Sequence, residues 1–438
     1  MKQTSLAVFG RKAGDFWIFW TGQTISQIGS ALTNFALPLL VFNLTGSALK
    51  VGLTLAATYL PYVLFGLVSG AWVDRVDRKV LMIGLDIARA ILLGLVPLLA
   101  FSTHFPLWWI YLITFLNATL SMIFGAASLT AIPHLVKRDE LIKANGRMQA
   151  GVYVAFIVGP LLATLILTHW SIQAVLWCDA LTFLGSAGSL GFIRSSFNGT
   201  PVQEQSQAAL GPAILEGLRY VFSHPVVYMA ALLALLVNMA LAPINAQVVV
   251  FAKQVLDASN TQVGVLATAL GVGGVLATLA AGPLKRRLPY GILLLGSLLL
   301  AGVLTIIFAI TRNFWASVIL WGGIYGMVAI FNVALFSILQ GAGPDRLLGR
   351  VILSAQLLAA LVVPVVDVLS GLVIDQVKNV ALVFGVLGVF IVVITLAFIP
   401  GPLAHVERFL LEGQSSSLPP VPPEEQPSSS TLQVSLDK

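Results

Sequence analysis

Four ionisable side chains lie inside long apolar runs of this sequence: Asp86, Arg89, Asp179 and Asp367. If those runs cross a lipid bilayer, a charge near the centre costs roughly 2.5–3.5 kcal/mol on insertion scales. Each group therefore needs a partner or a role. The chemistry open to it is ion pairing, hydrogen bonding to a neighbouring helix, or reversible protonation.

Three of these groups suggest a buried polar network. Asp86 and Arg89 are three residues apart, so a helix places them on one face, where they can pair with each other. We interpret this pair as structural or gating rather than as a substrate contact. Asp179 begins a helical face that continues with Thr182 and Ser186, which favours hydrogen bonding to a neighbouring helix.

Asp367 is the most isolated of the four charges and follows Pro364 by three residues. An unpaired carboxyl group in an apolar interior favours its protonated form and can therefore carry a proton. Proton coupling is one hypothesis for Asp367. The alternatives are a water-filled surrounding and a partner that the sequence does not reveal.

Uncharged polar residues form stripes in four apolar segments, the first, fourth, seventh and tenth. In the first, the polar residues follow one another at steps of four, three and four: Gln23, Gln27, Ser30 and Asn34. On a helix they fall within about 60° of one another around the axis. Amides that faced lipid would lack partners, so the stripes must face either neighbouring helices or a wet cavity. The residues expected to line such a cavity are Gln23, Gln27, Asn34, Asn117, Asn238, Asn245, Tyr325 and Asn332.

The elements that carry these residues must be membrane helices. Of the 438 residues, 58% are hydrophobic and only 10% are charged, against about 25% charged in soluble domains. A span needs about 20 mostly apolar residues. We predict an all-α integral membrane protein with twelve transmembrane helices, at about 16–42, 51–72, 80–101, 107–130, 148–168, 173–193, 223–250, 262–284, 291–311, 315–339, 350–374 and 380–400.

Positive charge predicts the orientation. Of the 24 lysines and arginines, only Lys50, Lys253, Arg312 and Lys378 fall in segments opposite the N-terminus, and Arg89 lies within a span. Because basic residues concentrate on the cytoplasmic side, we expect a multi-pass protein of the cytoplasmic membrane with both termini inside.

The chain divides into two related halves. We expect a six-helix bundle over 1–193, a linker over 194–222, a second bundle over 223–400 and a disordered tail over 401–438. In the linker, Ile214, Leu215, Leu218, Val221 and Phe222 recur at helical spacing, which predicts an amphipathic helix at the membrane surface. Loops after corresponding helices match at an offset of about 205–210 residues, as in transporters that alternate access around a central site.

The loop after the second span reads Gly70-Ala-Trp-Val-Asp74-Arg75-Val-Asp77-Arg78-Lys79. It resembles the signature loop of the major facilitator superfamily. The stretches Gly22–Gly29, Leu44–Ser47 and Glu216–Tyr220, together with Asp86 and Arg89, are similar to the drug:proton antiporter branch that includes macrolide efflux pumps and the enterobactin exporter. The resemblance covers nearly all of residues 15–400.

This resemblance implies two pseudo-symmetric six-helix bundles and a cytoplasmic gate. In the superfamily the signature aspartate, here Asp74, helps to lock the halves together by binding the start of the eleventh helix, which here carries Arg350. Topology alone is the alternative explanation for the basic residues of the loop. One departure concerns the fifth helix, where Ala163 and Thr164 stand where antiporters of the superfamily often have glycines.

The leading hypothesis is proton-coupled efflux of small amphipathic compounds, such as a drug, macrolide or siderophore, by a monomer in the lipid bilayer. An importer or lipid-type flippase on the same fold is the second hypothesis, and a membrane receptor or enzyme the third. The single cysteine, Cys178, and the scattered histidines favour no metal site. We expect no cofactor, no nucleic-acid partner and, without a phosphate-binding loop, no direct use of ATP.

Overall fold

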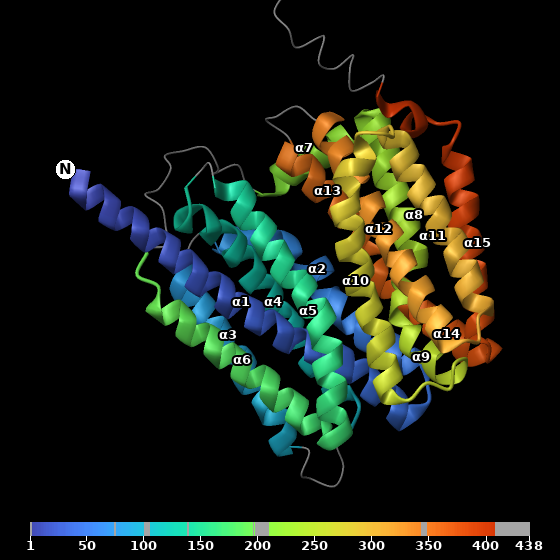
Figure 1. The fold of residues 1–438 in the computed structure, drawn as a ribbon, viewed down its shortest axis with the longest axis horizontal. Helices are drawn as coiled ribbons and strands as arrows, with labels where there is room; N and C mark the ends of the chain where they lie inside the picture. Colours follow the sequence, from blue (N-terminus) through green and yellow to red (C-terminus); the bar gives the residue numbers. More distant parts are fainter. Residues whose placement is uncertain are drawn as a thin grey trace, which may run out of the picture.

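The computed structural model describes residues 2–73, 76–99, 106–137, 140–195, 197, 210–342 and 348–407. Within these residues the regular secondary structure is helical, and twelve helices are long and apolar enough to cross a membrane. The predicted all-α membrane fold is therefore confirmed. The helices group into two bundles that stand side by side, with α7 at one end of the molecule and α9 at the other (Figure 1).

The first bundle contains the first six spanning helices. Within it, α1 packs on α5 and α6, α3 packs on α4 and α6, and α2 packs on α4. Helix α1 is continuous from its first described residue and so begins well before the predicted span. The bounds are α1 Lys2–Thr45, α2 Ala48–Val73, α3 Arg78–Leu99, α4 Trp108–Leu135, α5 Leu141–His169 and α6 Ile172–Phe192.

The second bundle contains the remaining six spans and two short elements. Helix α12 packs on α10 and α11, α11 packs on α15, and α8 packs on α13 and α14. The bounds are α8 Pro225–Ala246, α9 Val248–Gln254, α10 Asn260–Lys285, α11 Tyr290–Ile310, α12 Phe314–Ala342, α13 Leu348–Leu361, α14 Val363–Val377 and α15 Val380–Phe398, followed by a 3₁₀ turn at Pro402–His405.

Two of the predicted spans are each divided in two, and proline lies near both breaks. The predicted helix 223–250 ends as α8 after Pro243 and continues as α9 beyond Gln247. The predicted helix 350–374 is interrupted at Val362, just before Pro364. Proline removes an intrahelical donor and clashes with the turn that precedes it, which accounts for the break at Val362, whereas Pro243 lies inside α8 and the helix ends only after Ala246.

The bundles meet along two helix pairs, α2 with α14 and α5 with α10. Glycine makes the approach close. A side chain at Gly371 would come within 2.5 Å of the Ala48 carbonyl oxygen, and one at Gly271 would come within 2.7 Å of the Ile157 side chain. In Figure 1, α5 and α10 run side by side at the centre, where the two bundles join.

The linker contains the predicted helix, α7 Leu210–Ser223, which packs on α13 and α8. Val221 is fully buried there, as an apolar face requires. Phe222 is 61% exposed, and its ring centroid lies 5.9 Å from that of Tyr228 in α8.

Candidate functional site

A cavity of about 1340 Å³ lies between the two bundles. Its walls come from α1 to α5 on one side, with Arg89 as the α3 contribution, and from α8, α9, α10 and α12 on the other. The wall is largely apolar, with Phe35, Phe156 and Phe336 among aliphatic side chains, and polar groups interrupt it at intervals. A cavity of this size and character suits a drug-sized amphipathic molecule.

Six of the eight residues predicted to line a cavity do so. Gln23, Gln27 and Asn34 form the α1 part of the wall, and Asn245, Tyr325 and Asn332 form part of the opposite wall. The polar stripe of α1 thus faces both a cavity and a neighbouring helix, because Gln23 Nε2 also donates to Ser186 Oγ of α6 at 3.0 Å.

Asn117 and Asn238 lie outside this lining. Asn117 Oδ1 accepts from Arg89 Nε at 3.2 Å, which places it in the charge network of the first bundle. Asn238 Nδ2 donates to the Ala359 carbonyl oxygen at 3.0 Å and so joins α8 to α13. These two residues therefore make hydrogen bonds to neighbouring helices, the other of the two arrangements expected for the polar stripes.

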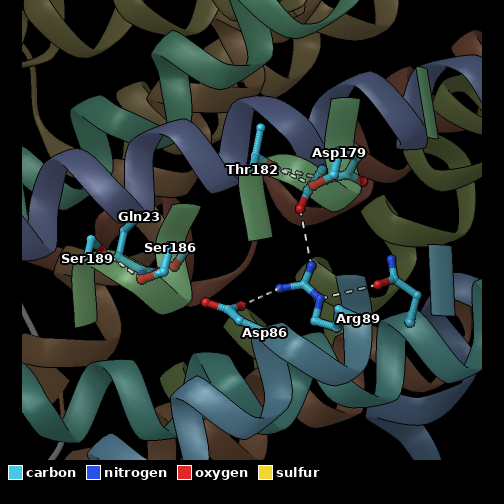
Figure 2. A network of polar contacts seen from close by, with 9 residues as sticks. Gln23, Asp86, Arg89, Asp179, Thr182, Ser186 and Ser189 are labelled. Carbon is cyan, nitrogen blue, oxygen red and sulfur yellow. Dashed lines mark hydrogen bonds and ion pairs between the residues drawn. The ribbon is translucent and has the colours of Figure 1, made fainter. Parts of the chain in front are cut away.

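Arg89 is the centre of the buried network, with its side chain 5% exposed. Its Nη1 lies 3.7 Å from Asp86 Oδ1, and its Nη2 donates to Ser30 Oγ at 3.1 Å. Figure 2 shows the guanidinium directed toward Asp86 on one side and Asp179 on the other. Its flat face also covers the Phe183 ring at 3.8 Å from the centroid, an arrangement that stabilises a desolvated cation.

The two carboxylates beside Arg89 are satisfied unequally. Asp179 Oδ2 accepts from Thr33 Oγ1 at 2.5 Å, and Oδ1 lies 3.4 Å from Thr182 Oγ1. Neither oxygen of Asp86 has a well-aligned donor among the described residues, although the Ser186 hydroxyl adds a weaker polar contact. Asp86 therefore depends mainly on the positive charge of Arg89.

Asp367 lies in the second bundle, 1% exposed, on α14. Its Oδ1 has no hydrogen-bond partner among the described residues. Electrostatic interaction links it to Tyr59 of α2 and Tyr325 of α12, which both line the cavity. The hydroxyl of Tyr325 is likewise buried without a partner in the described chain. This corner thus combines a buried carboxyl group that has one unpaired oxygen with two phenols beside the cavity.

The signature loop is described only in part. Asp74, Arg75 and the side chain of Arg350 lie outside the described residues, so their expected contact has no structural account here. Gly70 belongs to the last turns of α2. Beyond it, Asp77 Oδ1 accepts from the Val80 backbone and caps the start of α3 at 2.9 Å.

The basic residues of the loop bind backbone carbonyl groups. Lys79 Nζ donates to the Ile193 oxygen at 2.6 Å, and Arg78 Nη1 donates to the Phe197 oxygen at 3.2 Å. Both acceptors lie just beyond the end of α6. The two side chains therefore tie the start of α3 to the segment that leaves the first bundle, a role that charge topology alone did not predict.

Sequence reasoning missed several groups between the bundles. Tyr59 and Tyr62 line the cavity from α2, and Gln247 lies fully buried at the break between α8 and α9. Gln247 Nε2 donates to the Ala48 carbonyl oxygen of the first bundle at 3.2 Å. Pro243 and the amide Gln247 that follows it were the available signal, since a kinked helix leaves backbone groups to be satisfied.

Comparison with known proteins gives one family. A family model described as Major Facilitator Superfamily matches residues 19–365. Macrolide efflux protein A of Streptococcus pyogenes is 26% identical over 373 residues, covering 83% of this chain and 90% of that protein. Multidrug efflux pump Tap of Mycolicibacterium fortuitum is 27% identical over 352 residues, covering 78% and 84%.

Solved structures share the fold at low sequence identity. A bacterial homologue of the human lysosomal transporter Spinster, in an inward-facing and unoccupied conformation, superimposes with a TM-score of 0.71 at 14% identity, covering 92% of this chain and 98% of that one. The nucleoside transporter NupG gives a TM-score of 0.74 at 12% identity, covering 87% and 99%.

Proposed function

This chain belongs to the major facilitator superfamily and is a secondary transporter of small molecules, and we propose that it exports amphipathic compounds in exchange for protons. The observation that carries the proposal is the cavity between the bundles, whose wall is mostly apolar but bears amides, phenols and one guanidinium. Such a surface binds apolar ring systems and still offers hydrogen bonds to a few polar groups. The names of its relatives, which refer to macrolide and multidrug efflux, support the direction of transport.

The first test measures direction and cargo. Cells with and without the gene are compared for susceptibility to a panel of drugs and for accumulation of a labelled macrolide and of ethidium. Export predicts lower accumulation in cells that carry the gene and uptake into inverted membrane vesicles. Higher accumulation in cells would instead identify an importer, and movement of labelled lipid between leaflets without drug transport would identify a flippase.

Proton coupling is the second part of the proposal, and Asp367 is its candidate carrier. The unpaired Oδ1, the full burial and the neighbouring phenols support a site that can gain and lose a proton as the cavity changes its exposure. Collapse of the proton gradient should abolish vesicle uptake. Transport that persists unchanged after collapse would refute the coupling.

A pair of matched variants tests Asp367 itself. Asp367→Asn keeps the shape but cannot release a proton, so it should abolish uphill transport while leaving exchange of labelled for unlabelled substrate across the membrane. The control Asp257→Asn changes an exposed aspartate in the loop before α10, where the backbone φ of 49° also suits asparagine. Gradient-driven transport at the normal rate in Asp367→Asn would exclude this residue as the carrier.

The gate and the orientation complete the proposal. Asp74 would bind the start of α13 near Arg350 and close the α7 end, so Asp74→Asn should lower transport without lowering insertion into the membrane. The α7 end would face the cytoplasm, with both termini there, as the distribution of basic residues favours. We propose a monomer in the cytoplasmic membrane, since one chain contains both halves of the cavity wall.

A further inference from the structure

A carboxylate of the second bundle holds the first turn of a helix in the first bundle. Asp375 lies in the last turn of α14, and Ser47 directly precedes α2. Ser47 Oγ donates to Asp375 Oδ2 at 2.5 Å. The backbone N–H groups of Ala48 and Leu49 donate to Asp375 Oδ1 and Oδ2 at 2.8 and 3.1 Å.

These contacts make Asp375 an N-cap supplied from the opposite bundle. The first turn of any helix has N–H groups without intrahelical partners and carries partial positive charge, so it favours an anion. Helix caps normally come from the residue that begins the helix. Here Ser47 does accept from the Lys50 N–H at 3.3 Å, but its hydroxyl proton goes to Asp375.

The surrounding contacts allow the capping group to reach the helix. Gly371, one turn before Asp375, lies so close to Ala48 and Leu49 that a side chain would collide with their backbone. Gln247 Nε2 holds the Ala48 carbonyl oxygen from a second direction. The α9 end is therefore closed by polar contacts between the bundles, whereas Asp375 itself is only partly buried. Water can replace its partners, so the contact is reversible at modest cost.

The two helices run antiparallel, which gives this contact its significance. At the α7 end, the resemblance to the superfamily places Asp74, beyond the C-terminus of α2, against the start of α13. At the α9 end, Asp375, near the C-terminus of α14, lies against the start of α2. The observed Asp375 contact and the expected Asp74 contact would thus each set a carboxylate of one bundle against the start of a helix in the other bundle.

We propose that Asp375 is the positioning residue that closes the α9 end of the transporter, and that its cap on α2 breaks each time this end opens. Alternating access would then exchange one carboxylate-to-helix contact for the other, at opposite ends of α2. The inference rests on the alternating access of the proposed function. Its test measures the positions of the bundles without substrate. The inference can therefore fail while export is confirmed, and it can hold while export is refuted.

The test uses spin labels on the full chain in a Cys178→Ala background. One pair, Ser171→Cys with Thr261→Cys, reports the distance between bundles at the α9 end. A second pair, Asn145→Cys with Gly282→Cys, reports the α7 end. All four positions are exposed and lie outside the capping contact. Distances are measured by pulsed electron paramagnetic resonance in nanodiscs.

Asp375→Ala should raise the ratio of open to closed molecules at the α9 end by roughly 2- to 30-fold, the range expected for a lost N-cap. The α7 pair should move closer in the same variant, which local fraying of α2 would not produce. Asp375→Asn keeps one acceptor oxygen and should give a smaller shift, and Ser47→Ala should also shift toward open. The control Asp257→Asn, at the same end of the molecule, should leave both distributions unchanged.

Unchanged distances in folded Asp375→Ala would overturn the proposal, as would opening at the α9 end without closure at the α7 end. If Asp375→Ala fails to fold, the decision passes to Asp375→Asn and Ser47→Ala, which remove only part of the contact. Wild-type distances in both of those variants would overturn it equally.

Discussion

Replacing Arg89 tests how the charges inside the first bundle are balanced. Arg89→Gln keeps a hydrogen-bonding side chain of similar length but removes the positive charge. Asp86 then loses its ion-pair partner at 3.7 Å, while Asp179 keeps the hydroxyl donors Thr33 and Thr182. We therefore expect Asp86 to account for most of the resulting instability.

The magnitude follows from the burial of the group. Breaking a buried ion pair by removing one partner costs about 3–5 kcal/mol, and 1 kcal/mol corresponds to about 2–4 °C for a domain of 150–250 residues. Arg89→Gln should thus lower the unfolding temperature by roughly 6–20 °C. Adding Asp86→Asn should restore most of this loss. Adding Asp179→Asn should restore little, because Asp86 still lacks its partner and asparagine keeps only one oxygen to accept from Thr33 and Thr182.

The sole cysteine provides the assay. Cys178 is partly buried and adjoins Asp179 in α6, so a thiol-reactive dye reports opening of this part of the bundle on heating in detergent. The decisive comparison is between the two double variants. One double variant combines Arg89→Gln with Asp86→Asn, and the other combines it with Asp179→Asn. Equal unfolding temperatures for the two would refute the claim that Asp86 depends on Arg89 more than Asp179 does. If Arg89→Gln alone is as stable as the wild type, Arg89 does not compensate the buried carboxylates.

Three further changes have defined outcomes. Gly29→Ala should destabilise the protein by about 1–3 kcal/mol, because the new methyl group would lie 2.6 Å from Asp179 Oδ1. The control Gly188→Ala meets no atom within 4 Å and should not destabilise the protein; thermal unfolding compares the two variants. Ser259→Ala should cost about 1 kcal/mol by removing the capping box of α10, with Ser259→Asp as the retained cap. Burial lowers the pKa of His224, so the contribution of the neutral imidazole to stability is complete above pH about 6.5 and declines as the pH falls below it. His224→Phe should therefore reduce the dependence of the unfolding temperature on pH between pH 5 and 8.

The helices were predictable because the hydrophobic runs are long and the loops are short. Twelve apolar segments separated by basic loops leave little choice of fold. The breaks at Gln247 and Val362 were not predicted, since length alone cannot locate where a proline ends a helix within a membrane.

The site was predictable in composition but not in pairing. Spacing within one helix predicted the Asp86–Arg89 contact. It could not predict that Arg89 also reaches Ser30 and Asn117, which come from two other helices. The contact of Asp375 with Ser47 joins residues 328 positions apart, and neither residue has an unusual sequence environment. Only the antiparallel packing of α2 on α14 brings them together.

The two bundles differ in how they hold their buried acids, and this difference bears on the transport cycle. In the first, Arg89 compensates two carboxylates and is fixed by Phe183, so charge there is stabilised and should stay constant through the cycle. In the second, Asp367 has an oxygen without a donor among the described residues and two phenols for neighbours. Asp367 also lies on α14 two turns before Asp375, and its carbonyl oxygen would contact any side chain at Gly52 of α2. A shift of α14 against α2 that breaks the Asp375 cap would therefore change the surroundings of Asp367 as well, and would join opening of the α9 end to the proposed proton exchange through a single helix.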